Sequence, residues 1–168
     1  MTQELIDLRN SILAGRYEDA LAIVDELEGM SKQAILRNIQ SFLRVLLIHL
    51  IKNQIEQRLT NSWVVSIRNA LVEIKKINLK ENKKSYYINK DEWENYLEEE
   101  IELAIGDASV EVLNGIYTEF QLAEMVDKYQ IISIAFKFLE LTYVHSVKEL
   151  PKAITEIIIE LPGGEKWQ

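Results

Sequence analysis

Residues 31–60, SKQAILRNIQSFLRVLLIHLIKNQIEQRLT, contain neither proline nor glycine, and only Arg44 and His49 interrupt the apolar run over 42–51. As a single helix this segment would be about 45 Å long, at roughly 1.5 Å per residue. A helix that is apolar nearly all round its middle must be covered by other helices. Ser31 is a favourable N-cap for it. The segment therefore predicts the long central helix of an all-α protein.

Most of the remaining chain also has the apolar spacing of amphipathic helices. These patterns occupy 3–13, 17–28, 63–74, 91–113, 117–129 and 152–161, and glycines or prolines separate several of them. Residues 131–144 are ambiguous, because their apolar residues fit both strand alternation and helical spacing. The helical surroundings favour a helix there. We predict a compact bundle of six to eight helices without a sheet, forming a single domain over 1–168.

The charge of the chain is strongly segregated. Residues 1–30 carry two basic and seven acidic side chains, 31–90 carry twelve and three, and 91–168 carry five and seventeen. The basic middle third indicates one of two arrangements. Acidic helices lie against the basic helix and neutralise it, or the basic segment 31–90 binds or processes nucleic acid. The first interpretation is favoured, since charge blocks usually describe how faces pair.

Composition limits the classes of function. The chain has no cysteine, which excludes disulfides and thiolate sites and is typical of a reducing compartment. Its first ten residues lack the pattern of a signal peptide, and its apolar run is about half of what a membrane span needs. We therefore expect a cytoplasmic protein. No phosphate loop, nucleophile elbow or zinc helix is present, so we expect no cofactor and no metal, and the sequence favours a protein that is not an enzyme.

Two charged segments allow a binding or a structural interpretation. Lysines and the pair Tyr86–Tyr87 fill the tract 75–90, which could hold single-stranded nucleic acid by charge and stacking. We favour a solvated connection that its tyrosines anchor.

Glu94, Glu98 and Glu102 repeat every four residues and so share one helix face. For this row, ion pairs with the basic middle third are favoured over a metal site.

The central segment also carries the pattern of a known family. The matching positions are Glu26, Glu28 and Met30 before the helix; Ser41, Leu43, Leu46, Leu47, His49, Leu50 and Lys52 within it; and Ser62, Trp63, Ile67 and Arg68 at the next helix start. Over about 25–113 the chain resembles the uncharacterised family called domain of unknown function twenty-nine. The resemblance implies an all-α core over about 1–113, followed by a helical extension over about 117–161, and it implies no activity.

Taken with the resemblance, the sequence gives four candidates for binding residues: His49, Lys52, Trp63 and Arg68. In a functional interpretation, the histidine and the lysine share one helix turn beside the tryptophan. In a structural one, His49 is a core residue that hydrogen-bonds Ser62 or a glutamate of the preceding helix. The structural interpretation is favoured. We predict a non-enzymatic protein-interaction module that binds a partner protein or a second copy of itself; nucleic-acid binding is the alternative.

Overall fold

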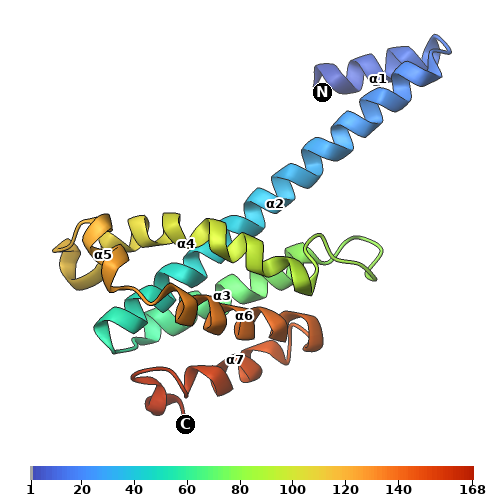
Figure 1. Ribbon diagram of the computed structural model, residues 1–168. Helices are drawn as coiled ribbons and strands as arrows, with labels where there is room; N and C mark the ends of the chain where they lie inside the picture. Colours follow the sequence, from blue (N-terminus) through green and yellow to red (C-terminus); the bar gives the residue numbers. More distant parts are fainter. Residues whose placement is uncertain (1) are drawn as a thin grey trace. The chain divides into compact units, whose positions relative to one another are not determined.

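The computed structural model describes residues 2–168, and within that range it is helical and contains no strand (Figure 1). Seven α-helices follow one another: α1 (Gln3–Leu13), α2 (Tyr17–Glu56), α3 (Asn61–Asn78), α4 (Trp93–Ser109), α5 (Glu119–Met125), α6 (Lys128–Val144) and α7 (Leu150–Ile158). Short 3-10 turns occupy Lys90–Glu92, Val112–Gly115 and Gly164–Trp167. The predictions of an all-α fold and of six to eight helices are confirmed.

The chain forms two compact units. Unit 1 extends to Asn38 and unit 2 comprises Ile39–Gln168, so that α2 contributes to both. Unit 1 is a helical hairpin in which Gly15 makes the turn with a positive φ of 74°. Only two residues described in unit 1, Ser11 and Ala20, are buried. The prediction of one domain over the whole chain stays a prediction.

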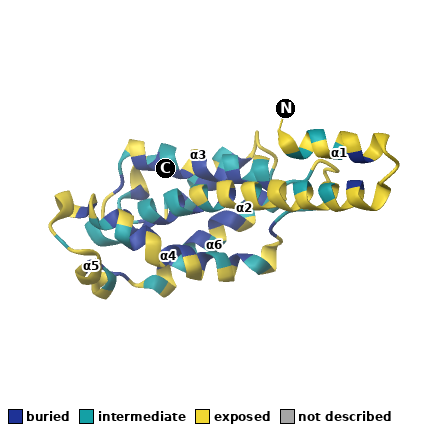
Figure 2. Cartoon of the chain, turned by 90° about the horizontal axis from the view of Figure 1, so that it is seen from above, coloured by how far each residue is buried: buried dark blue, intermediate teal, exposed yellow. Residues whose placement is uncertain are grey.

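Unit 2 holds the hydrophobic core. Along α2 the buried side chains recur at helical spacing on Ile39, Leu43, Leu46, Leu47, Leu50 and Ile51. Helix α6 contacts α3, α4 and α7. Figure 2 shows dark, buried stretches on α3, α4 and α6. By length and composition α2 alone among the described helices could span a membrane, a test that core helices of soluble proteins also pass. The expectation of a cytoplasmic protein that does not span a membrane therefore stays a prediction.

Helix α2 differs from the predicted helix at both ends. It begins at Tyr17 and runs through Gly29 and Ser31, so the predicted stop and N-cap at those residues are wrong. One helical glycine costs only about 1 kcal/mol, which good helix formers on both sides outweigh. The helix ends at Glu56, before Gln57 with its positive φ of 52°.

Three other predictions concern shorter elements. Residues 131–144 are helical within α6, so the helix that the surroundings favoured over a strand is confirmed. This helix packs against α3, α4 and α7. Residues 117–129 do not form one helix, since α5 covers only Glu119–Met125 and Val126 is extended. Pro151 lies in the first turn of α7, directly before the predicted helical pattern 152–161.

Candidate functional site

The structure brings two of the four sequence-predicted site residues into direct contact. Lys52, on α2, lies with its ammonium nitrogen 4.6 Å from the centroid of the Trp63 ring, at the start of α3. The guanidinium carbon of Arg58 lies at the same distance from that ring. Lys52 is only 11% exposed at its side chain, and its ammonium forms an ion pair with Glu111 at 3.6 Å. Trp63 is thus a buried anchor with two cation–π partners.

His49 lies half-buried one turn before Lys52, and its imidazole Nδ1 is 2.8 Å from the Val45 carbonyl, to which it donates a hydrogen bond. The predicted partners, Ser62 or a glutamate of the preceding helix, are therefore wrong. Burial is the main cause that lowers the pKa of His49 below its ordinary value of 6.5, and Lys52 lowers it further. The Val45 hydrogen bond and Glu111 act in the opposite direction. A lowered pKa keeps the ring neutral at pH 7.

The fourth candidate, Arg68, is not part of this cluster. It is exposed on α3, and its guanidinium donates a 3.4 Å hydrogen bond to the side chain of its neighbour Asn69. Sequence reasoning missed Glu111, which is 59 residues from Lys52 and belongs to a turn with no motif. Within residues 2–168 no group of three or more acidic or histidine side chains is placed to hold a metal ion. The Lys52–Trp63 cluster can stabilise the α2–α3 junction.

The basic helix is neutralised where it enters unit 2. Arg44 forms ion pairs with Glu100 at 3.0 Å and with Asp107 at 3.7 Å, both on α4. Together with Lys52 and Glu111, these pairs join the middle third of the chain to the acidic last third. The favoured interpretation of the charge segregation, in which acidic helices face the basic one, is confirmed for this part of α2.

A buried hydrogen-bond network fixes the connection after α3. The Asn78 amide donates to the Ile88 carbonyl at 2.9 Å and accepts from the Ile88 N–H at 2.7 Å. Tyr143 donates to the same carbonyl and accepts from the Trp93 indole N–H at 2.6 Å. Burial raises the pKa of the Tyr143 phenol to about 12. Tyr143 also contacts Tyr86, and the centroids of the two rings are 4.7 Å apart. Tyr86 therefore anchors the connection, in agreement with the structural interpretation of the tract 75–90.

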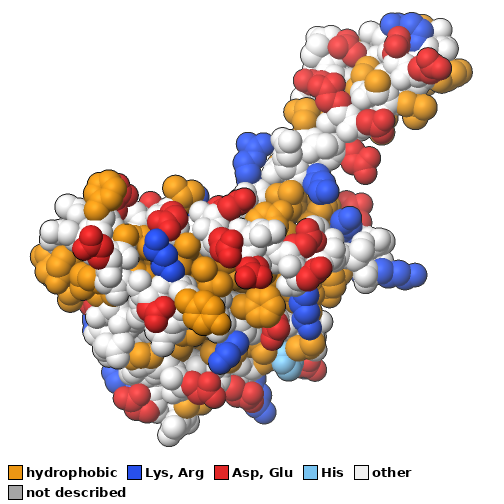
Figure 3. Space-filling model, viewed as in Figure 1, with side chains coloured by type: hydrophobic (Ala, Val, Ile, Leu, Met, Phe, Trp, Pro, Cys, Tyr) orange, Lys and Arg blue, Asp and Glu red, His pale blue; other side chains and the backbone are white. Residues whose placement is uncertain are grey.

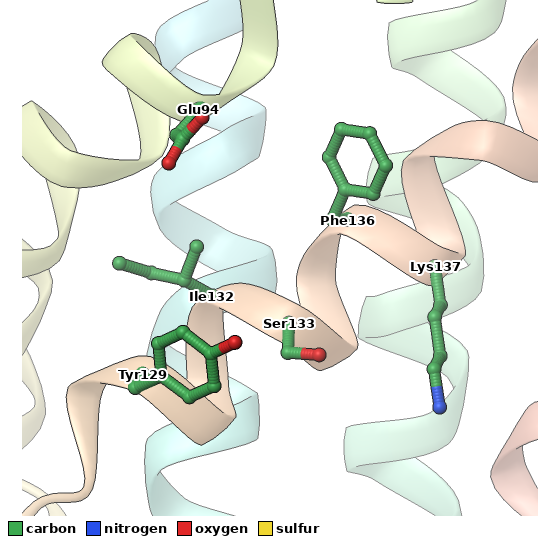
Figure 4. A pocket seen from close by; sticks show the side chains of 6 residues that line it. All are labelled: Glu94, Tyr129, Ile132, Ser133, Phe136 and Lys137. Carbon is green, nitrogen blue, oxygen red and sulfur yellow. The ribbon is translucent and has the colours of Figure 1, made fainter.

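A second candidate site is a groove between α4 and α6 in unit 2, called the α4–α6 groove. It is open to solvent, has a volume of about 340 Å³, and is lined by Glu94 of α4 and by Tyr129, Ile132, Ser133, Phe136 and Lys137 of α6 (Figure 4). The three apolar residues recur at i, i+3 and i+7, so they form one stripe on α6. Tyr129 is 84% exposed. Nothing in the sequence pattern distinguished this stripe from the core face of the same helix.

The acidic row on α4 begins at this groove. Glu94 lines it, and Glu102 forms an ion pair with Lys128 at the start of α6. Glu98 lies one turn from each of them and therefore on the same face. Among residues 2–168, Glu94 and Glu98 have no ion-pair partner. The prediction that this row pairs with the basic middle third is wrong, because Glu102 pairs with Lys128 on α6.

The fold and these contacts define an all-helical protein whose polar clusters are largely satisfied internally. The family model described as domain of unknown function DUF29 matches residues 13–129, more than half of the chain. The chain belongs to this family, as the resemblance suggested, and the match extends beyond the expected 25–113 at both ends. Comparisons with curated proteins and with solved structures found no match.

Proposed function

We propose that the protein is a non-enzymatic helical module that binds a partner protein or a second copy of itself. The supporting observation is that exposed large apolar side chains gather in two stretches. Within residues 2–168, seven lie between 5 and 30 and seven between 103 and 129. The first set, called the N-terminal apolar surface, comprises Leu5, Ile12, Leu13, Tyr17, Leu21, Val24 and Met30; the second comprises Leu103, Val110, Leu113, Ile116, Phe120, Met125 and Tyr129.

Such clustering is typical of interaction surfaces. Single exposed apolar residues are common on monomeric proteins, whereas contiguous groups indicate binding sites. Figure 3 shows apolar side chains over the part of unit 2 that α4, α5 and α6 form. In unit 1 the apolar residues of α1 and of the start of α2 recur at helical spacing, yet few are buried. An amphipathic helix normally buries such a stripe, and a protein partner would do so.

Fluorescence-detected sedimentation velocity tests this proposal on the full chain, alone over a concentration series and then in native lysate. We expect sedimentation faster than that of a 19.5 kDa monomer in at least one of these conditions. Replacing exposed apolar residues in both stretches, Leu13→Ser with Leu21→Ser and Phe120→Ser with Met125→Ser, should restore the monomer rate. The matched control is Val144→Ser with Val147→Ser, two exposed residues outside both stretches. A monomer in every condition would show that the proposal is wrong.

The alternative proposal is nucleic-acid binding by the basic segment 31–90. Exposed lysines of the connection after α3, such as Lys83 and Lys84, support it. Against it, Arg44 and Lys52 are engaged in ion pairs, and Tyr86 packs on Tyr143. Gel shifts with single- and double-stranded DNA and RNA at low salt test it, because phosphate contacts are strongest there. We expect no shift, and a shift that Lys83→Glu with Lys84→Glu abolishes would favour the alternative.

A further inference from the structure

We propose that the α4–α6 groove binds a basic amphipathic helix of a partner protein. This inference rests on the proposed function as an interaction module, and it names the surface and the chemistry of the partner. Its elements both belong to unit 2 and contact one another. The groove combines an apolar floor with an acidic rim, and each part restricts what can occupy it.

The floor suits the apolar side of a helix. Tyr129, Ile132 and Phe136 present a stripe at i, i+3 and i+7 that none of the other described helices fully covers. A partner helix with apolar residues at the same spacing can place them against this stripe, which is the usual geometry of helix-in-groove recognition. A single exposed aromatic such as Tyr129 would carry little meaning, whereas Tyr129 together with the half-buried Ile132 and Phe136 on one helix face defines a surface.

The rim determines the charge of the partner. Glu94 lines the groove, and Glu98 lies one turn further along the same face of α4. Neither has an ion-pair partner within residues 2–168, while Lys128 neutralises Glu102. Lysine or arginine residues that flank the apolar stripe of a partner helix would pair with the two free carboxylates. Such charge complementarity favours one partner over others and speeds encounter. The rim therefore selects a basic helix over an acidic one.

The geometry also determines how far the basic residues should extend along the partner helix, and on which side of that helix they should lie. From Glu94 to Glu102 the row spans about 12 Å along α4, which corresponds to about two helical turns. Lys137 lies at the α6 side of the groove, away from Glu94 (Figure 4). A partner that is basic on every side would be repelled there, so its cations should lie on the side that faces α4.

The same charges disfavour other occupants. Residues 91–168, which include both walls of the groove, carry seventeen acidic and five basic side chains. Nucleic acid and anionic membrane surfaces are repelled by such a field. A second copy of the chain would have to present a basic apolar helix, and its acidic N-terminal hairpin does not.

Fluorescence anisotropy with the full chain tests the inference. The probe is a labelled synthetic helix of about 18 residues, with leucines at i, i+3 and i+7 and lysines along one flank. The control peptide carries glutamates in place of the lysines. We expect the lysine peptide to bind and the glutamate peptide to bind at least about tenfold more weakly.

Matched variants locate the binding. Glu94→Lys with Glu98→Lys should weaken binding of the lysine peptide about tenfold, whereas Glu99→Lys should leave it nearly unchanged. Glu99 is an exposed α4 residue that lines a different hollow with Glu92 and Tyr96. For the floor, Tyr129→Ser should weaken binding and Val144→Ser, exposed at the other end of α6, should not. Circular dichroism confirms that each variant is folded.

The outcomes separate the two proposals. Equal binding of both peptides, or an equal loss with Glu99→Lys, would show non-specific attraction and overturn the inference. If neither peptide binds while the chain still forms complexes in sedimentation, the groove assignment fails and the interaction module stands. If the chain is a monomer throughout and no peptide binds, both proposals fail.

Discussion

The imidazole of His49 illustrates how a polar side chain can be satisfied without being a site. Its Nδ1–H donates to the Val45 carbonyl, four residues earlier. In an α-helix that carbonyl also accepts the backbone N–H of His49, so removal of the ring leaves no orphaned partner. The neighbouring Lys52 and Glu111 pair with each other. The ring therefore contributes mainly by packing at the edge of the α2 core.

We expect His49→Ala to lower the free energy of unfolding by about 1 kcal/mol at neutral pH, because a half-buried ring is lost. Urea denaturation of the variant and of the wild-type protein measures this difference. Preserved stability together with loss of a binding activity would contradict the packing role and make His49 a site residue.

The same comparison has a pH dependence whose sign follows from the lowered pKa. In the unfolded chain His49 titrates near 6.5, whereas the folded protein holds its pKa below that value. The unfolded state therefore binds the proton first, and the wild-type protein loses stability as the pH falls through that interval. We expect the difference between wild type and His49→Ala to shrink below about pH 6.5. A difference that grows on acidification would contradict the lowered pKa.

At the scale of the elements, the continuity of α2 through Gly29 is the main departure from the sequence expectation. An added Cβ at Gly29 would meet no heavy atom within 4 Å, and its φ is not positive. Alanine there should reduce the entropy of the unfolded chain and favour the helix. We expect Gly29→Ala to raise the free energy of unfolding by about 1 kcal/mol, measured by thermal or urea denaturation.

Gly15 provides the matched control for this prediction. It makes the turn between α1 and α2 with a φ of 74°, and it also has open space around its Cβ position. Because that backbone conformation is strained for a residue with a side chain, Gly15→Ala should destabilise the protein. If Gly29→Ala behaved like Gly15→Ala, a helix end at Gly29, as the sequence suggested, would be correct.

The elements show what local pattern can determine. Apolar spacing predicted the helices over residues 3–13 and 63–74. Over 131–144 the spacing fitted both a strand and a helix, and only the helical surroundings favoured the helix that the structure contains. Thr60 caps α3 with its hydroxyl, which accepts the Trp63 N–H at 3.1 Å. The sequence pattern did not predict where α2 begins and ends, nor that α5 is short. Glycine and serine weaken a helix locally, but the stability of the whole segment decides whether the helix ends.

The site residues also show what the sequence pattern cannot predict. Lys52 and Trp63 are eleven residues apart on consecutive helices, so their proximity followed from the sequence pattern. Glu111 pairs with Lys52 only because the fold returns the end of α4 to α2. The groove was invisible in the sequence, since helical spacing marks which residues share a face and not which face a neighbour covers.

At the scale of the whole molecule, the charge that remains after the internal ion pairs is acidic. Arg44 and Lys52 are paired with carboxylates of the last third. The N-terminal thirty residues add seven acidic and two basic side chains around the N-terminal apolar surface. Two copies meeting through that surface would gain apolar contact and would also repel electrostatically.

This opposition gives self-association a distinctive salt dependence. Between about 50 and 500 mM NaCl the Debye length falls severalfold, so the repulsion between acidic hairpins weakens while apolar burial persists. We expect self-association through the N-terminal apolar surface to tighten about threefold or more over that range, as measured by sedimentation equilibrium. Leu13→Ser with Leu21→Ser should be monomeric at both salt concentrations, since these exposed leucines belong to that surface. Association that weakens with salt would instead require an interface between opposite charges, and would point to the acidic rim of the α4–α6 groove meeting a basic segment of a second chain.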